Sequence, residues 1–594
     1  MKKIKRFLRT DTAFFIILAA VVFFLYAKTI NYEFTKLDDD MLISRNINFI
    51  SQIKNIPGLF LTSCYYSDSF FYYRPVLSLS FAFESILTGN KIKIYHFSNI
   101  ILFVLCIYLM YVFLTLLKYD RKLLKFVCLL IASHPMFSSC VAWLPARNDT
   151  LLFIFICLSF INLTYYVKFK KKSYLSYFTL FFAAALFTKE TAVILLPLCV
   201  FYLYFFNIKP DKIRIKYLLT VALSVSALYF YMRSIAISGG HSLNLDMLNY
   251  YMANWLKGSI TYIYKFFIPS NLPLMLYNIK LNFTAIATNL VFLFFLFWAF
   301  LKKMIRGKTI VFLFVWTLAW IAPTFLMNDY ALLFHRFIIA SVFFGATLTE
   351  IAQNLTIKFD LVKKYLVLFF AVLFGSYSFA SYNQADKYKN APVFWAHAYS
   401  DAPDYHLTCY GLAQRFMETG DYKKALELLI SADRYMPLRY RTDIASVLIR
   451  QKRFNEAEII LLDTATASNS SAIKYFVYGT LSKLYIEKKD FTKALDCALK
   501  ASSLNNNDTE ILKMLVTAYS LNGKYQQALS ICTELLKYDP QNAQYYYKAA
   551  ELYELMKDYK NAKKYITQGL KLAPDNIQLI EKEESLKSLN NETN

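Results

Sequence analysis

The fold of the C-terminal part of the chain is decided by five short segments: GDYKKAL (420–426), KRFNEAE (452–458), KDFTKAL (489–495), GKYQQAL (523–529) and KDYKNAK (557–563). Each segment has a turn, an aromatic residue, two polar residues and an alanine, and the alanines are spaced by 32, 37, 34 and 34 residues. Pro540 and Pro574 also lie 34 residues apart, where second helices should end. This period is typical of tetratricopeptide repeats, in which small alanines let paired helices approach closely. Residues 383–594 are therefore predicted to form an α-solenoid.

The preceding residues have a different composition. The 594-residue chain is 57% hydrophobic and 18% charged, with a net charge of +25. About 38 bases and about 15 acids lie in residues 1–382, whereas the later part is nearly neutral. An apolar region with surplus bases excludes a wholly soluble or disordered protein and is typical of a polytopic membrane protein. Nucleic-acid binding is not expected, because the bases sit in short clusters between apolar runs.

Residues 1–382 contain about eleven apolar runs of membrane-spanning length. They lie near 13–27, 97–117, 124–142, 150–167, 174–187, 191–207, 217–236, 283–301, 309–327, 332–350 and 365–381. Basic clusters at 118–125, 168–172, 209–216, 302–308 and 358–364 fall on one side of the resulting topology, together with the basic N-terminus. The predicted fold class is all-α, with a polytopic domain (1–382) followed by a repeat domain (383–594).

This topology places the N-terminus in the cytoplasm and the repeats on the opposite face of the membrane. The expected location is the cytoplasmic membrane of a bacterium, or the endoplasmic reticulum membrane in a eukaryote. No cleavage site follows the first run, so we expect it to be a retained anchor. Two mixed stretches, 76–87 and 247–268, are predicted to lie in the membrane interface.

Three adjacent carboxylates stand out in a region that is poor in acids. Asp38, Asp39 and Asp40 follow the first apolar run by about ten residues. Crowded carboxylates repel one another and raise at least one pKa, and such a group can accept a proton from a hydroxyl. The alternative, which the spacing leaves open, is a solvated acidic turn that caps a helix starting near Met41.

Other polar residues fall on the same predicted face. They are Arg74, Arg147, Asp149, Lys189, Glu190, His335 and Arg336, with His96 and Asn99 at the start of a span. Charges at a membrane edge are costly and usually functional, and arginine and lysine could hold a lipid-linked phosphate. Taken singly, each could equally be an anchor or an ion pair between neighbours, such as Lys189 with Glu190 or Arg147 with Asp149.

The order of these motifs resembles a known family. An acidic pair after the first span, RP, H-x-x-N, R-x-D, KE and then tetratricopeptide repeats is similar to the TMTC proteins and their bacterial relatives. These are GT-C membrane glycosyltransferases related to the protein O-mannosyltransferases. In this chain Asp38 and Asp39 match the acidic motif, and Asp40 lies at a more variable place. Phe103 replaces a second histidine of the relatives, and FHRFIIAS lacks the tyrosine and proline that usually follow the arginine matched by Arg336.

The resemblance implies transfer of a hexose, with mannose the expected sugar, from a polyprenyl-phosphate sugar to Ser or Thr of an exported protein. Asp38, Asp39 and Asp40 would supply the general base. Arg74, His96, Asn99, Arg147, Asp149, Lys189, Glu190 and Arg336 would bind substrate. No cofactor is expected to be obligatory, although a divalent metal could bind the acidic trio. The repeats would present the acceptor polypeptide.

Two other functions remain open at this point. An envelope polysaccharide ligase or polymerase also joins many spans to exported repeats, although such enzymes rely on a large late loop. A membrane-anchored repeat scaffold would need one span, and about eleven are hard to explain. The nine cysteines and six histidines show no CxxC or Cys/His metal spacing.

Overall fold

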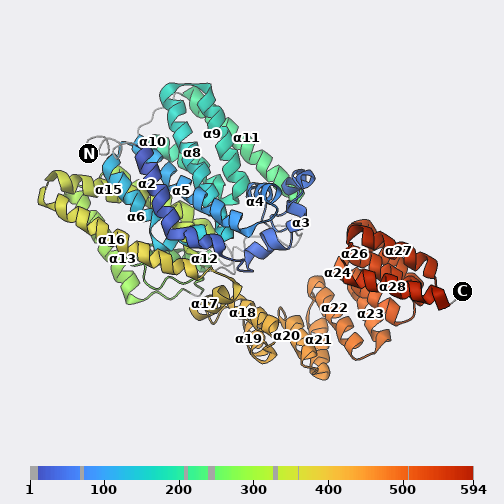
Figure 1. The fold of residues 1–594 in the computed structure, drawn as a ribbon. Helices are drawn as coiled ribbons and strands as arrows, with labels where there is room; N and C mark the ends of the chain where they lie inside the picture. Colours follow the sequence, from blue (N-terminus) through green and yellow to red (C-terminus); the bar gives the residue numbers. More distant parts are fainter. Residues whose placement is uncertain are drawn as a thin grey trace. The chain divides into compact units, whose positions relative to one another are not determined.

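A computed structural model describes residues 11–66, 72–205, 212–237, 248–277, 279–325, 332–358, 360–505 and 508–592. In these residues the regular structure is helical, apart from one isolated bridge between Leu276 and Leu332. The chain divides into two compact units, Met1–Ala402 and Pro403–Asn594 (Figure 1). The expected all-α fold class is confirmed.

The first unit contains sixteen named α-helices within its described residues. They are α2 (Asp11–Tyr26), α3 (Ile47–Ile50), α4 (Pro75–Thr88), α5 (Ile92–Leu116), α6 (Arg121–Ala132), α7 (Ser139–Ala142), α8 (Arg147–Phe169), α9 (Lys172–Thr188), α10 (Leu195–Phe205), α11 (Lys212–Ala236), α12 (Leu248–Phe267), α13 (Phe283–Leu301), α14 (Gly307–Ile321), α15 (Ser341–Lys358), α16 (Asp360–Asp386) and α17 (Ala391–Asp401). Short 3-10 and π-helical turns join them, including η1 (Ala27–Asn31), η2 (Asp40–Ser44), η7 (Glu190–Ile194) and η10 (Phe334–Ile338).

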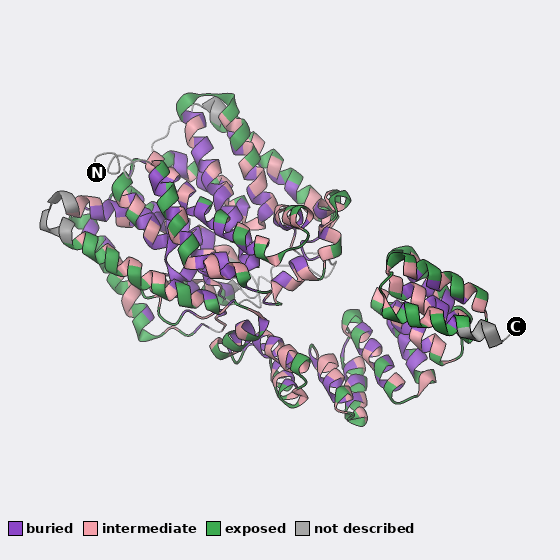
Figure 2. Ribbon diagram, in the orientation of Figure 1, coloured by how far each residue is buried: buried purple, intermediate pink, exposed green. Residues whose placement is uncertain are grey.

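Helix α8 lies at the centre of this unit. It packs against α5 and α9, and most of its residues are buried (Figure 2). Helices α11, α13 and α16 instead expose many large apolar side chains. A helix that is apolar on its outer face is expected where lipid replaces water.

Six described helices are long and apolar enough to cross a membrane, or seven if the bent pair Arg121–Ala132 and Pro135–Ala142 forms one span. The sequence predicted about eleven runs of this length. The difference arises at four of the predicted runs. Three of them form α9, α10 and α14, which have 17, 11 and 15 residues, and the run at 332–350 is divided between η10 and α15. Breaks at Lys189–Ile194 and after Ile321 shorten the runs that the hydropathy pattern merges. The two stretches predicted at 76–87 and 247–268 form α4 and α12.

The second unit is a series of helix pairs. The first helices are α18 (His406–Thr419), α20 (Arg441–Arg450), α22 (Ser471–Glu487), α24 (Thr509–Leu521) and α26 (Ala543–Leu555). The second helices are α19 (Tyr422–Tyr435), α21 (Phe454–Ala467), α23 (Phe491–Leu504), α25 (Tyr525–Tyr538) and α27 (Tyr559–Leu572), and α28 (Ile577–Glu592) follows. Each repeat alanine is fully buried, because it faces the partner helix: Ala425, Ala457, Ala494, Ala528 and Ala562.

The turns of the repeats follow from their residues. Gly420 and Gly523 have φ of +82° and +71°, a left-handed conformation in which glycine avoids a Cβ clash. Asp421 and Asp490 then accept backbone hydrogen bonds at the starts of α19 and α23. Pro540 follows α25, which ends at Tyr538.

The boundary between the units falls later than the predicted 382/383. Helix α16 continues to Asp386, and α17 packs with the first unit, where the Leu274 N–H donates to Asp401 at 2.6 Å. The composition changes before the fold does, because the polar stretch 383–390 precedes α17.

Candidate active site

Asp38 faces the cationic groups of the first unit. Its carboxylate lies in the field of the Arg74 and Arg336 guanidinium groups and interacts with the Tyr65 hydroxyl. Burial raises the pKa of Asp38, while these three groups oppose the rise. Asp38 is therefore a carboxylate of raised basicity in the field of two arginines.

Asp39 and Asp40 do not share this direction. Asp39 is 1% exposed, and it accepts hydrogen bonds from Thr35 N (2.6 Å), Thr35 Oγ1 (3.0 Å) and Leu37 N (3.1 Å). Burial raises its pKa to about 6, against the hydrogen bonds from Thr35. Asp40 accepts from Ser44 Oγ at 2.6 Å and from Arg45 Nε at 2.5 Å. The structure therefore separates the three adjacent carboxylates, since two of them fix the local loop.

Arg74 is bound on three sides. It precedes Pro75, the first residue of α4, and donates from Nη2 and Nε to the Glu190 carboxylate at 2.6 and 3.1 Å. With its amide oxygen turned toward Arg74, Asn148 accepts from Nη1 at 2.9 Å and donates to Thr188 O at 3.0 Å. The Tyr72 ring covers the guanidinium at 4.4 Å. Arg74 is a fixed cation whose charge is balanced by Glu190.

A second ion pair lies in the same cluster. Lys189 Nζ donates to Asp149 Oδ1 at 2.8 Å, and His335 Nε2 lies 3.5 Å from Asp149 Oδ2. These three side chains are at most 12% exposed. Burial lowers the pKa of Lys189 and brings that of His335 to about 3, so the histidine is neutral at pH 7.

The pairing of these charges follows from the local backbone. Lys189 is extended, and neighbouring residues of an extended chain point to opposite sides, so Lys189 reaches Asp149 while Glu190 reaches Arg74. At the start of α8 each residue is rotated by about 100°, which sends Asn148 and Asp149 to different partners. The expectation that sequence neighbours pair with each other, Lys189 with Glu190 and Arg147 with Asp149, is wrong.

Arg336 differs from the other two cations. It lies in η10 and influences Asp38, Asp149 and Lys189 electrostatically. Within the described ranges, no side chain forms an ion pair or a hydrogen bond with its guanidinium. Arg336 is therefore a cation with free donors beside Asp38.

The cluster around Asp38 has no net charge. Asp39 is not counted in it, because its carboxylate is stabilised by hydrogen bonds from Thr35 and Leu37. Three carboxylates face three cations around a neutral histidine. The members are Asp38, Asp149, Glu190, Arg74, Lys189, Arg336 and His335. Buried charges are costly unless they are paired, and an unpaired arginine in such a place suits an incoming anion.

Arg147 belongs to a different network. It is fully buried and donates to Asn99 Oδ1 (2.7 Å), Glu84 Oε1 (2.9 Å) and Tyr95 O (2.8 Å). These bonds tie α4 and α5 to the start of α8. Arg147 and Asn99 thus support the helices rather than facing Asp38.

His96 lies near Arg147 and is 1% exposed. Neither ring nitrogen has a hydrogen-bond partner among the described residues. The ring packs edge-on against Tyr32, with centroids 6.2 Å apart. His96 is therefore outside the cluster around Asp38.

Three members of these networks were missed by the sequence analysis. Tyr65 and Asn148 give no signal of their own, because a tyrosine in an aromatic-rich loop and an asparagine at a helix start are common. Glu84 could have been found, since an acid within the apolar stretch 76–87 needs a buried partner.

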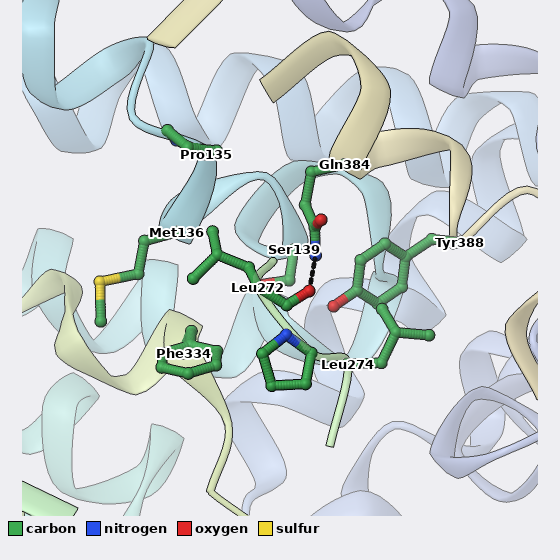
Figure 3. A pocket seen from close by; sticks show the side chains of 9 residues that line it. Pro135, Met136, Ser139, Leu272, Leu274, Phe334, Gln384 and Tyr388 are labelled. Atoms are coloured by element: carbon green, nitrogen blue, oxygen red, sulfur yellow. Dashed lines mark hydrogen bonds between the residues drawn. The ribbon is translucent and has the colours of Figure 1, made fainter. Parts of the chain in front are cut away.

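No group of three or more His, Cys, Asp or Glu side chains in the described part of the chain could hold a metal ion. All nine cysteines are buried and free. The first unit also contains a small pocket, which is lined by Met136, Ser139, Phe334, Gln384 and Tyr388, among others (Figure 3). Gln384 Nε2 donates to Leu272 O at 3.0 Å in its wall.

The sequence family that matches the chain does so within the second unit. The tetratricopeptide-repeat sequence family matches residues 477–508 and 521–581. The C-terminal unit therefore contains tetratricopeptide repeats, as predicted. No curated protein sequence matches the chain.

Similar solved structures are also repeat proteins. YrrB, a TPR protein with an unusual peptide-binding site, is 16% identical over 32% of this chain and 97% of its own, with a TM-score of 0.26. A thermophilic TPR protein from Thermus thermophilus is 18% identical over 30% of this chain and 98% of its own, with a TM-score of 0.26. PilF of Pseudomonas aeruginosa is 20% identical over 34% of this chain and 87% of its own, with a TM-score of 0.28.

Proposed function

We propose that the chain is a membrane glycosyltransferase of the GT-C type. It would transfer a hexose from a polyprenyl-phosphate sugar to a Ser or Thr hydroxyl of an exported polypeptide. The proposal rests chiefly on one observation: Asp38, a half-buried carboxylate of raised pKa, lies in the electrostatic field of Arg336, whose guanidinium has no hydrogen-bond or ion-pair partner among the described residues.

The proposed chemistry uses Asp38 as the base and Arg336 as the cation that meets the leaving group. Asp38 takes the proton from the acceptor hydroxyl, and the hydroxyl oxygen bonds to the anomeric carbon of the sugar. The bond from that carbon to the phosphate oxygen breaks, and its electron pair leaves with the phosphate. Arg336 neutralises this leaving group, with Lys189 as the nearby second cation. A single displacement inverts the anomeric carbon and needs no enzyme nucleophile.

The paired residues have a supporting part in this reaction. Glu190 and Asn148 hold Arg74, and Asp149 holds Lys189 as an ammonium despite its burial. Fixed charges cost no reorganisation when the phosphate leaves. Arg74 thus maintains the field around Asp38, while Arg336 has donors to offer.

The membrane setting is part of the proposal. A polyprenyl tail must be met within the bilayer, and the six long apolar helices provide such a surface. We expect the shorter helices α9, α10 and α14 to complete about eleven crossings in a GT-C arrangement. The N-terminus would be cytoplasmic, and the repeats would lie outside the cytoplasm, in a bacterial membrane or the endoplasmic reticulum.

The tetratricopeptide repeats suit a polypeptide acceptor. Among the described helices, the first helices α20, α22 and α24 contact each other in succession, whereas the second helices make weaker contacts or none with one another. Such stacking curves a solenoid toward its first helices and creates an extended surface. We expect this surface to bind the acceptor.

The proposal is tested with purified full-length protein, polyprenyl-phosphate hexoses and a Ser/Thr-rich peptide, with product measured by mass spectrometry. Asp38→Asn should reduce transfer at least 100-fold, because a general base is removed. Asp40→Asn is the matched control, since Asp40 bonds only its own loop. Absence of transfer by the wild type with every donor tried, or full activity of Asp38→Asn, would refute the function.

The anion-binding role is tested separately. Arg336→Met should raise the KM for the donor about tenfold, as expected for one lost charge-assisted contact. Arg45→Met changes an arginine that pairs with Asp40 away from the cluster, and it should leave the KM unchanged. Equal effects of the two substitutions would argue against a phosphate at Arg336.

A non-enzymatic scaffold is the second candidate. It is favoured by the sequence match, which lies in the repeats at 477–508 and 521–581. A scaffold should bind its partner equally well with Asp38→Asn and Arg336→Met, and it should show no hexose transfer. Partner binding that depends on either residue would exclude it.

A further inference from the structure

A tryptophan connects the loop that carries Asp38 with the segment that carries Arg336. Trp143 lies between α7 and α8 and is 4% exposed. On one side its indole Nε1 donates to Thr35 Oγ1 at 3.2 Å. On the other side its ring centroid lies 5.4 Å from that of His335. Segments separated by about 300 residues in sequence thus meet at one side chain.

The contact with Thr35 fixes the loop before Asp38. The Thr35 hydroxyl accepts from Trp143 and donates to Asp39 Oδ2 at 3.0 Å, while Thr35 N donates to the same oxygen at 2.6 Å. Because Asp39 also accepts from Leu37 N, the backbone on both sides of Asp38 is tied down. The bonds that involve Thr35 are buried, so water does not replace a partner that is lost there.

The contact with His335 fixes the segment before Arg336. His335 is held between the Trp143 ring and the Asp149 carboxylate, 3.5 Å from its Nε2. Tyr388 backs the indole from a further direction, with centroids 6.5 Å apart in a stacked arrangement. Since His335 and Arg336 are consecutive in the tight turn η10, the position of one ring limits the position of the guanidinium.

We infer that Trp143 is a positioning residue that holds the carboxylate of Asp38 in register with the guanidinium of Arg336. Tryptophan combines a large rigid ring with one N–H donor, and both are used here. The inference rests on the proposed function, because the register matters only if a hydroxyl and a phosphate must be held together. Misplacement of reacting groups by a fraction of an ångström lowers turnover more than binding.

The experiment uses the full-length protein in detergent, with donor saturation curves at a fixed acceptor concentration. Trp143→Phe keeps a ring and removes the donor, and Thr35→Val removes the acceptor. Each should lower kcat about tenfold with the donor KM within about twofold of wild type. The double variant should be no slower than the slower single variant, because both remove one link.

Tyr202→Phe is the matched control. Tyr202 is fully buried, and its hydroxyl forms a hydrogen bond with Thr164 Oγ1 at 2.7 Å that joins α10 to α8. Loss of this hydrogen bond should lower the melting temperature of the protein about as much as Trp143→Phe while leaving kcat unchanged.

The outcomes separate the two claims. A wild type that transfers no hexose refutes the proposed function, and the inference falls with it. The inference alone is overturned by an active wild type in which the effects of Thr35→Val and Trp143→Phe on kcat multiply, or in which Tyr202→Phe loses as much kcat as Trp143→Phe. A change confined to the donor KM would also overturn it.

Discussion

Replacing one carboxylate oxygen with an NH2 group should have opposite effects at Asp38 and Asp39, although the residues are neighbours. The change at Asp38 should mainly lower kcat, and the change at Asp39 should mainly lower stability. Asp38→Asn keeps the shape of the side chain. Asp38 is half-buried and forms no close ion pair among the described residues, so we expect the melting temperature to change little. The substitution removes the proton acceptor, and a general base contributes about 100- to 10,000-fold, or about 3–5 kcal/mol.

Asp39→Asn places an amide NH2 where the carboxylate receives three donors. Thr35 N and Oγ1 bond one oxygen, and Leu37 N bonds the other, at 2.6–3.1 Å. Whichever way the amide turns, one buried donor faces another, which costs about 1–3 kcal/mol of folding free energy. We expect a clear loss of stability and a loss of kcat of at most about tenfold, through misplacement of Asp38.

The assay measures both quantities on the same preparation. Hexose transfer is followed under single-turnover conditions with saturating donor, and melting is followed by intrinsic fluorescence. Asp40→Asn provides the baseline for both. A stable but active Asp38→Asn, or an inactive Asp39→Asn of unchanged stability, would show that the base has been assigned to the wrong carboxylate.

Three further predictions follow from the buried networks. Tyr65→Phe removes a hydroxyl group whose interaction with Asp38 lowers the pKa of that carboxyl, so the acidic limb of kcat/KM should move to higher pH; an unmoved limb would mean that Asp38 does not titrate in it. Glu84→Gln leaves the buried Arg147 without a counter-charge and should destabilise the first unit by about 3–5 kcal/mol with no change in donor KM, as measured by melting and donor titration. Burial raises the pKa of Asp443 to about 6 from 3.8, so the folded repeats keep this proton while the pH rises from about 4 to 6, and their stability falls across that range. Asp443→Asn should make the melting temperature of the repeats less dependent on pH in this range. An unchanged dependence would contradict the shift.

The repeats were predictable because their information is local. A 34-residue period, an alanine at a fixed position and a following proline each reflect contacts within one helix pair. The structure buries those alanines fully, and Asp421 caps the helix that the pattern starts there. The domain boundary was harder, since the polar stretch 383–390 suggests a break, yet α17, which follows it, belongs to the first unit.

The sequence predicted which residues lie near one another in the cluster, but not how they pair. Sequence placed Asp38, Arg74, Lys189, Glu190, Asp149 and Arg336 on one face, and the structure brings them together. The sequence could not show which of the three carboxylates faces the arginines. Consecutive side chains in a tight turn point in different directions, and these directions depend on the fold. Nor could the sequence separate Arg147 from Asp149, two residues apart, which the first turn of α8 sends to different networks.

The charge balance of the cluster leads to a last prediction, which links donor binding to base strength. The donor phosphate brings one negative charge to a site that is neutral before it arrives. A unit charge about 6 Å from Asp38, at an effective dielectric constant of about 20, contributes about 3 kcal/mol, or up to about two pH units. The incoming anion therefore raises the pKa of Asp38, so the carboxylate becomes a stronger base once donor is bound.

Two pH profiles of the same enzyme report this difference. The acidic limb of kcat/KM for the donor reflects free enzyme, whereas that of kcat reflects the donor complex. We expect the kcat limb at the higher pH, and activity in both profiles to fall as the pH drops through the respective pKa, because the base must be ionised. Arg336→Met should move the acidic limbs of both profiles to higher pH, since it removes a positive charge that lowers the pKa of Asp38. Coincident limbs in the wild type would place the phosphate too far from Asp38 for a direct displacement, since the anion could then not share a pocket with the base.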